Sequence, residues 1–453
     1  MTSVKKRFLA LGVVLSLFSP AFAQSQNAPA PLTLQESVKY ALENNEAVKK
    51  AYLDEKSAEY KVKEVKGSGL PQLNGTGTLT MNPALPTQLL PGELAGQPGT
   101  LIPVQFGTKY VASAGVSLQQ LLFNKSFFVG LEAAKTTKDL YRLRTQMSEE
   151  EVIYNVSSAY MQLLQTREQF NTIDANFKRL EQLEKIVNLQ YRNDIATKVQ
   201  LNRVTVNKTN LENTRQTLQA AYDQQLNALK FFMGMPVDQE VAISETAPNL
   251  NVPVLAQDDA SNVLYNRSDY QLLNKQRQLQ SLNVKNIQAR YYPSLSGFGN
   301  VGSSAQRNEF NFLDTKQPWF NTVAIGLQLN VPIFDGFQRR HQIKQAKIEV
   351  EKTEQDIRQV TNATNMSLKN AATQMQSSLN AVQAQERNVT LAQEVYRNTN
   401  ELYKEGLSPL TDLLDTEVSL REAQTNLNNE RLKYQLAQLT YLQAKGELKS
   451  LIQ

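Results

Sequence analysis

The chain has 453 residues and a formal net charge of +5 at pH 7, with no cysteine and one histidine. The absence of cysteine excludes a disulfide scaffold, thiolate metal sites and cysteine catalysis. A single histidine, His341, excludes metal sites built from clustered histidines and disfavours a histidine-based triad. Because basic and acidic residues are almost balanced, the composition does not indicate a nucleic-acid-binding protein.

The first 23 residues have the pattern of a secretory signal peptide. A basic start is followed by an apolar run from Phe8 to Phe18 and by the small-residue sequence Ala21-Phe22-Ala23. This pattern predicts cleavage after Ala23. The apolar run is too short to cross a bilayer as a helix, so we favour a signal peptide over a membrane anchor. The mature protein is therefore expected to be exported.

Two long tracts of the chain predict helices of unusual length. Proline is absent from residues 104–235 and 333–408, which are rich in good helix formers. Apolar residues recur at spacings of three, four and seven, as in a coiled coil. The spacing of seven is clearest in Leu413, Leu420, Leu427, Tyr434 and Tyr441. We predict two helical hairpins, at about 126–232 and 337–449, whose longer helices extend about 100 Å.

A short turn is predicted at the tip of each hairpin. In the second hairpin, Gly406 suits a left-handed backbone position after a helix end, and Leu407 is its apolar companion. Ser408 is expected to cap the return helix, with Pro409 as its first residue. Asp194 takes the place of the glycine in the first hairpin; aspartate can adopt the left-handed conformation, but at a higher energy than glycine.

The two halves of the sequence are related as an internal duplication. A constant offset aligns the two hairpins, for example Tyr191 with Tyr403. Each half is expected to contain a helix, two short strands, a long helix, a turn and a return helix. The predicted organisation is a first repeat at 24–234, a proline-containing linker at 235–258 and a second repeat at 259–453.

Short, glycine-rich segments between the helices predict strands. Apolar residues alternate with polar or small ones in 73–81, 110–119 and 322–331, and more weakly in 294–302. Strands of this length and pattern fit a barrel wall in lipid, although a water-soluble sheet with one buried face is the alternative. Four strands cannot close a barrel, and lipid does not tolerate open edges, so several chains would share one barrel. The segment 82–107, with five prolines, is expected to be a long outside loop.

The combined pattern resembles TolC-like outer membrane efflux proteins. The resemblance rests on the duplication, the strand pairs, the long helices and the motif Tyr-x-x-Gly-x-x-x-x-x-Asp-x-x-Asp at 403–415, and it extends over about 32–450. It implies a mainly helical protomer whose four strands complete a 12-stranded trimeric β-barrel in the outer membrane. A long α-helical coiled-coil tunnel would continue the barrel into the periplasm.

The same resemblance implies partners and a function. The homotrimer would sit in outer-membrane lipid and would dock with a periplasmic adaptor (membrane fusion) protein and an inner-membrane pump. It would export small molecules or proteins from a tripartite efflux or type I secretion system without chemistry of its own. The cargo (drugs, metals or proteins) and the class of pump remain open at this stage, because the pump selects what is carried.

The resemblance places a periplasmic gate at the tip of the second hairpin. Asp412 and Asp415 share roughly one face of the return helix, and three chains would give two carboxylate rings that attract cations. Without the resemblance, these acids would simply favour the helix dipole. Tyr403 matches a tyrosine that helps to hold the entrance shut, but Gln200 stands where its acidic partner is usual. Ser408 stands where some members carry a latch arginine, so we expect a weaker latch.

The hairpin turns are implied to contact the adaptor. The residues concerned are Gly406, Leu407 and Ser408 in the second hairpin and Asp194, Ile195 and Ala196 in the first. A helix-capping role explains Gly406 without any partner, so the glycine alone does not establish this contact.

No set of residues indicates an enzyme, a cofactor site or a metal site. The run from Gly297 to Gly302 spells a dinucleotide fingerprint, but it lies within a predicted strand rather than before a helix. The alternative to a conduit is a structural or adhesive coiled-coil protein of the cell envelope. Strand pairs in the middle of both repeats favour the conduit, because adhesins usually have one barrel anchor at an end of the chain.

Overall fold

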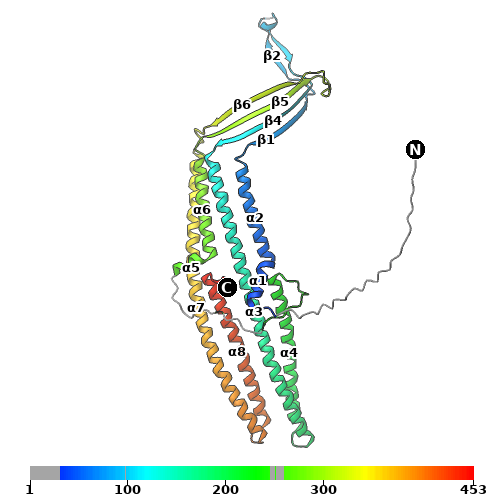
Figure 1. Ribbon diagram of the computed structural model, residues 1–453, viewed down its shortest axis with the longest axis vertical. Coiled ribbons are helices and arrows are strands. Elements are labelled where there is room, and N and C mark those ends of the chain that lie inside the picture. Colours follow the sequence, from blue (N-terminus) through cyan, green and yellow to red (C-terminus); the bar gives the residue numbers. More distant parts are fainter. Residues whose placement is uncertain (1–30, 97, 245–249, 251–259, 453) are drawn as a thin grey trace, which may run out of the picture.

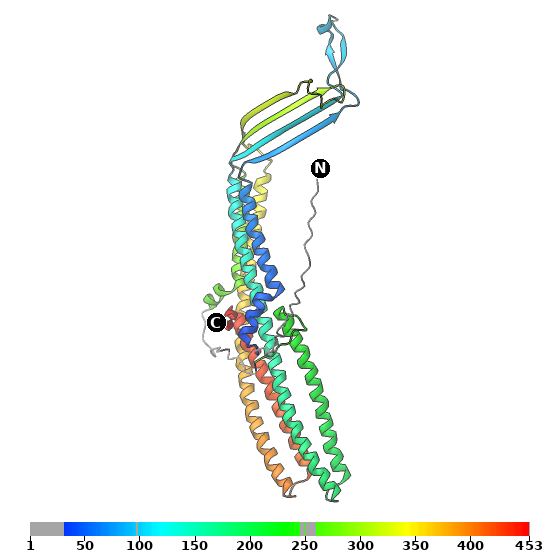
Figure 2. The same ribbon diagram turned by 45° about the vertical axis from the view of Figure 1, so that its right-hand side comes forward.

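The structure is a computed structural model that describes residues 31–96, 98–244, 250 and 260–452. The chain is elongated, with a β-sheet at one end, the tips of two helical hairpins at the other, and long helices between them (Figures 1 and 2). The predicted signal peptide, 1–23, and much of the predicted linker, 235–258, lie outside the described residues.

Four antiparallel strands form the main sheet in the order β1-β4-β5-β6. Their bounds are β1 Gln72–Met81, β4 Tyr110–Phe123, β5 Ser294–Arg307 and β6 Phe320–Asn330. The four segments predicted from alternation overlap these strands, and β4 and β5 each extend several residues beyond the predicted end. The two strand pairs, one from each half of the chain, join through β4 and β5 into one continuous sheet.

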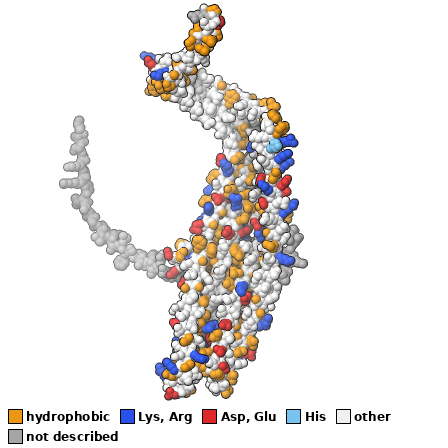
Figure 3. All heavy atoms as spheres, turned by 180° about the vertical axis from the view of Figure 1, so that it is seen from behind, with side chains coloured by type: hydrophobic (Ala, Val, Ile, Leu, Met, Phe, Trp, Pro, Cys, Tyr) orange, Lys and Arg blue, Asp and Glu red, His pale blue; other side chains and the backbone are white. Residues whose placement is uncertain are grey.

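The strand register carries the alternation across the whole sheet. Leu118 pairs with Leu73 on one side and with Gly299 on the other, and Gly299 pairs with Ile325. These residues therefore share one face, on which Ile325 is 87% exposed. The corresponding row of the opposite face is Asn74, Ser117, Asn300 and Ala324. Charged side chains gather mainly over the helices, whereas most of the visible sheet surface is uncharged (Figure 3).

Strand β5 alternates weakly because of its glycines. Gly297 and Gly299 take positions on the apolar face, where their neighbours supply the larger side chains. Phe298 points to the opposite face and lies over Gly326 of β6, where an added Cβ would be only 2.7 Å from the Phe298 ring. Packing between strands thus compensates for a pattern that is poor within one strand.

The segment 82–107 is more ordered than the loop expected from its sequence. It contains β2 (Thr87–Pro91), the 3-10 helix η1 (Gly92–Ala95) and β3 (Leu101–Gln105). β2 and β3 pair antiparallel, and this ribbon projects from the end of the sheet that is remote from the helices (Figures 1 and 2). Within this segment, Pro91 and Pro103 lie at positions that a two-stranded ribbon tolerates.

Two hairpins of very long helices make up most of the remaining chain. Their helices are α3 Lys125–Arg192, α4 Lys198–Met233, α7 Gln338–Lys404 and α8 Leu410–Lys445. α3 has 68 residues and α7 has 67, which at about 1.5 Å per residue gives rods of about 100 Å. A 3-10 helix, η2 (Leu448–Ile452), follows α8. None of the described helices combines the length and apolarity needed to cross a membrane.

Shorter helices flank the upper parts of α3 and α7. They are α1 Leu34–Asn44, α2 Glu46–Gly67, α5 Ala260–Asn266 and α6 Ser268–Ala289. Toward the sheet, helices pack side by side in the order α2-α3-α6-α7; toward the tips the order is α4-α3-α8-α7. In the described chain, α7 is therefore one edge of the helical wall, and α2 and α4 form the other.

The main hydrophobic core lies at mid-height, where side chains of α1, α3, α4 and α8 pack together (Figure 1). Tyr160 of α3 is fully buried there, and its hydroxyl donates to Leu32 O and Ser244 O, each at 3.2 Å. Leu32 also forms a parallel bridge with Ile243. These bonds fasten the segment before α1 to the segment after α4, so the first hairpin is anchored at its base.

Candidate functional site: the hairpin tips

Both hairpin tips turn through a left-handed backbone position. Gly406 has φ 75° and Asp194 has φ 58°. In each turn the following amide donates to the carbonyl five residues earlier, at 2.8 Å, which closes the end of the descending helix. Ile195 is 76% exposed and Leu407 is 71% exposed. The two turns therefore share one geometry and present an apolar side chain at the same place.

The return helix α8 begins one residue later than predicted. Pro409, in extended conformation with ψ 156°, is the N-cap, and Leu410 is the first helical residue. Ser408 is therefore not the N-cap; its hydroxyl donates to Asp412 Oδ2 at 3.3 Å. Proline fits this place because an N-cap residue has a non-helical backbone.

Tyr403 has a different partner from the one suggested by the sequence. Gln200 is the third residue of α4, and its side chain accepts from the Thr197 amide at 2.7 Å in a capping box. The Tyr403 hydroxyl donates instead to Gln190 Oε1 at 3.2 Å, which links α7 to α3. Burial raises the pKa of Tyr403, and the bond to Gln190 offsets this only in part, so the tyrosine remains a neutral donor.

Asp412 and Asp415 lie on the exposed face of α8, while Leu413 and Leu414 between them are buried. Asp412 accepts a hydrogen bond from Ser408, and in the described part of the chain neither carboxylate forms an ion pair. Neither carboxylate therefore has a paired countercharge among the described residues. Their position near the N-terminal end of α8 is electrostatically favourable.

Helix α3 presents two chemically different faces toward the tips. One face carries Ile173, Leu180 and Val187, which form an apolar cluster with α4 residues Leu201, Val204 and Leu211. Near the tip, Leu410 and Leu414 of α8 join this cluster. The apolar cluster thus holds the first hairpin together and reaches α8 only at its lowest turns.

The other face of α3 makes polar contacts with α8. These contacts are Gln169 with Asn429 at 2.8 Å, Thr172 with Asn428 at 3.4 Å, and Asn176 with Gln424 at 3.4 Å. Asn176 is fully buried, yet its Oδ1 has no hydrogen-bond partner in the described chain. We call this α3–α8 contact the hairpin seam. Two of its three hydrogen bonds are long, so it is weaker than the apolar contact of α3 with α4.

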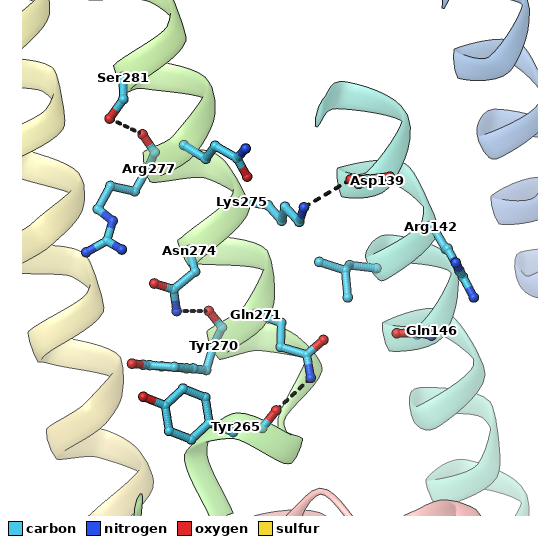
Figure 4. A pocket seen from close by; sticks show the side chains of 12 residues that line it. Asp139, Arg142, Gln146, Tyr265, Tyr270, Gln271, Asn274, Lys275, Arg277 and Ser281 are labelled. Atoms are coloured by element: carbon cyan, nitrogen blue, oxygen red, sulfur yellow. Dashed lines mark hydrogen bonds and ion pairs between the residues drawn. The ribbon is translucent and has the colours of Figure 1, made fainter. Parts of the chain in front are cut away.

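A groove of about 810 Å³ lies far from the tips, between α3 and α6. Lys275 pairs with Asp139 across it at 3.0 Å, and Tyr265 and Tyr270 stack edge to face at its lower end (Figure 4). Asn274 donates to the Tyr270 carbonyl on its own helix. Apart from the Lys275–Asp139 pair, the hydrogen bonds of its polar side chains run to backbone carbonyls of α5 and α6, which is typical of an indentation in a helical wall.

The described residues contain no group of three or more histidine, cysteine, aspartate or glutamate side chains suited to a metal ion. The single histidine, His341, is exposed near the start of α7. The geometry at the tips thus supplies exposed carboxylates, apolar turns and a polar contact between the two hairpins.

A sequence profile of the family described as outer membrane efflux protein matches residues 38–235 and 260–447. The chain belongs to this family. It is an efflux protein of the outer membrane, and the family is one of transport proteins rather than enzymes. Both matched regions contain one complete hairpin, so all the tip residues described above lie within them.

Individual relatives are distant but cover most of the efflux protein. It is 23% identical to the outer membrane protein TolC of Vibrio cholerae, over 74% of this chain and 77% of the relative. It is also 23% identical to the toluene efflux pump outer membrane protein TtgC of Pseudomonas putida, over 91% and 82%. Among solved structures, the V. cholerae outer membrane protein VceC superposes with a TM-score of 0.70 at 17% identity, covering 91% and 96%.

Sequence reasoning missed Gln190 and the polar residues of the seam. A usable signal was present, because Gln169, Thr172, Asn176 and Arg179 recur at spacings of three and four. Polar residues at this spacing indicate a helix face that packs against polar side chains or water. The sequence does not say which helix covers that face.

Proposed function

We propose that the protein is a homotrimeric channel-tunnel that exports small molecules or proteins across the outer membrane. Three chains would place 12 strands in one barrel and continue it as a helical tunnel into the periplasm. The unpaired edges carry the proposal: β1 and β6 end the main sheet, and α7 ends the helical wall opposite α2 and α4. In a threefold ring, β1 of one chain would pair with β6 of the next, and α7 would pack against α2 and α4 of a neighbouring chain.

The two faces of the sheet support a barrel in lipid. An apolar row such as Leu118 and Ile325 faces one side, and a row such as Asn74, Ser117 and Asn300 faces the other. Lipid requires an apolar outer face and closed hydrogen bonding, and a water-filled lumen suits the polar face. Exposed apolar strands on an open edge would otherwise promote aggregation.

The internal duplication explains why the protomer contains two similar halves, each of which contributes two strands and one long hairpin. The family profile matches two successive regions, and each contains two main-sheet strands and one long hairpin. We therefore retain repeats at 24–234 and 259–453 joined through 235–258. Because strands from both repeats form one sheet, the arrangement disfavours an adhesive protein with a single terminal anchor.

The hairpin tips would form the periplasmic entrance. Three copies of Asp412 and Asp415 would give two stacked carboxylate rings that attract cations and repel one another. The contact of Tyr403 with Gln190 would oppose opening, but one neutral hydrogen bond contributes only about 1 kcal/mol. This supports the weaker latch expected from Gln200 and Ser408. The exposed turns at Gly406–Ser408 and Asp194–Ala196 are the proposed contacts of a periplasmic adaptor that links an inner-membrane pump.

Disulfide trapping tests the trimer directly, because the natural chain has no cysteine. Cysteine at Thr76 of β1 would be combined in turn with cysteine at Thr322, Ala324 or Gln328 of β6, on the predicted lumen side. At least one pair is expected to give covalent trimers. Cysteine at Ser117, in the inner strand β4, combined with the same β6 partners is the matched control and should give none. A monomeric mass together with no cross-link in any β1–β6 pair would contradict the proposal.

A further inference from the structure

One ionisable side chain occupies the otherwise apolar buried face of α8 between the tip and the hairpin seam. Glu417 of α8 is 3% exposed and shares its buried face with Leu413, Leu414 and Leu420. Toward the tip, Leu414 joins the apolar cluster of α3 and α4. Away from the tip, the polar contacts begin at Gln424. Glu417 therefore marks the point at which apolar packing gives way to polar contact.

Three helices contribute to the surroundings of Glu417. On α8, Arg421 Nη1 lies 3.8 Å from Glu417 Oε2, which is too long for a hydrogen bond. From α3, Arg179 acts on the carboxylate electrostatically, and its guanidinium lies 5.7 Å from the ring centroid of Tyr396 on α7. In the described chain, both Glu417 carboxylate oxygens and Arg179 Nε and Nη2 are buried without hydrogen-bond partners.

This environment penalises the charged form of Glu417. A buried carboxylate needs both a countercharge and hydrogen bonds, and here the hydrogen bonds are missing. Burial raises the pKa of Glu417, and Arg421 and Arg179 lower it only in part. Burial also raises the pKa of Tyr396, which therefore stays neutral, and arginine is not deprotonated in proteins. Glu417, the carboxylic acid of this cluster, thus holds its proton more tightly because it is buried.

We propose that Glu417 is a proton-dependent latch, which holds α8 against α3 when it is protonated and favours their separation when it is ionised. This inference rests on the proposed conduit and adds a control that acts inside each subunit, apart from the carboxylate rings. Separation of the helices would admit water to the carboxylate and return its pKa toward the ordinary value of 4.5.

The direction of the pH effect follows because Glu417 binds its proton more tightly in the closed state than in the open state. The added stability of the closed state is fully present below the ordinary pKa of glutamate and is lost as the pH rises through the raised pKa. Opening is therefore easier at neutral pH than in acid. Each pH unit between the pKa values of the two states changes the ratio of open to closed subunits about tenfold.

A distance measurement between the two hairpin tips tests the latch without relying on conduction. Spin labels would be attached through cysteine at Arg192 of the first hairpin and Glu405 of the second, both exposed. The full-length protein would be studied in lipid nanodiscs, with labelled subunits diluted by unlabelled ones. Between about pH 5 and pH 8, the population with the longer distance is expected to increase.

Three variants assign the effect to its residue. Glu417→Gln should remain close to the closed distance at every pH, because its amide keeps the shape of the protonated acid. Arg179→Gln removes a cation that lowers the pKa, so its transition should move to higher pH and still be present. Glu422→Gln, which neutralises an exposed acid on the same helix away from the proposed gate, is the matched control and should keep the parental transition. Thermal unfolding would confirm that each variant is folded.

A transition that is unchanged in Glu417→Gln would overturn the latch, as would a shift to lower pH in Arg179→Gln. The outcome is separable from the conduit itself. A protein that conducts but shows pH-independent tip distances disproves the latch alone, whereas a protein that forms no trimer and no channel disproves the conduit.

Discussion

Between the mid-height core and the lowest turns at the tips, helix α3 contacts α4 mainly through apolar side chains and α8 mainly through polar ones. The first contact is made by a continuous cluster that includes Leu180 and Leu211, with 1% and 2% of their surfaces exposed. The second relies on hydrogen bonds of 2.8 to 3.4 Å and leaves several buried polar atoms unpaired. Separating buried apolar side chains costs free energy in proportion to the area exposed. Hydrogen bonds between polar side chains contribute little net free energy, because water can replace them when the helices separate. The difference indicates that α3 and α4 stay together as one hairpin, whereas α8 of the second hairpin separates from α3 more easily.

The largest predicted effect comes from weakening the apolar contact. Leu180→Ala should destabilise the protein by about 2–5 kcal/mol, because it leaves a cavity in a fully buried cluster. Denaturant unfolding of the purified protein in detergent measures this change. Gln424→Ala in the seam is the matched comparison and should cost about 1 kcal/mol. Equal losses in the two variants would contradict the distinction between the two contacts.

A smaller effect is expected from the bond that joins the hairpins at the tip. Tyr403→Phe removes the donor to Gln190 and should weaken closure by about 0.5–1.5 kcal/mol, without a large loss of folding stability. Single-channel recordings should show more frequent or larger openings. Tyr434→Phe, on the same hairpin and away from the tips, provides the control. If Tyr403→Phe and the control conduct alike, this bond does not contribute to the latch.

The smallest effects should appear in the two turns, which share a left-handed position but not a residue. Asp194→Gly should stabilise the first hairpin by about 1 kcal/mol or less, because glycine adopts this conformation more easily. Gly406→Ala should destabilise the second by a similar amount, although its Cβ would have open space. Thermal unfolding of both variants measures the pair. Shifts in the same direction would show that the turns are not equivalent.

Local patterns were sufficient to predict the strands and long helices. Period-two alternation located segments that overlap β1, β4, β5 and β6, and heptad spacing located both hairpins. These signals are contained within short stretches of chain. The β2–β3 ribbon was not predicted, because the five prolines of 82–107 indicate a loop rather than strands.

Contacts between distant helices were harder to predict. Gln190 and Tyr403 are 213 residues apart, and their meeting depends on the rotation of two long helices about their axes. The resemblance implies that Gln200 stands opposite Tyr403, but the Gln200 side chain instead forms a capping box with Thr197 at the start of its own helix. The sequence alone does not predict the burial of Glu417, because an acid in a coiled coil is ordinarily solvated. Glu417 is buried because α3 and α7 pack beside α8, and this packing is not encoded in any short stretch of sequence.

Cation block of the reconstituted channel tests the central claim most directly. The protein would be recorded in planar bilayers beside Asp412→Ala/Asp415→Ala and the control Glu401→Gln, whose exposed acid is already paired with Lys404. We predict a small conductance that a trivalent cation blocks from the hairpin-tip side, with block weakened about tenfold or more in the double variant and unchanged in the control. Equal block in all three proteins would contradict a conduit gated by carboxylate rings at the hairpin tips.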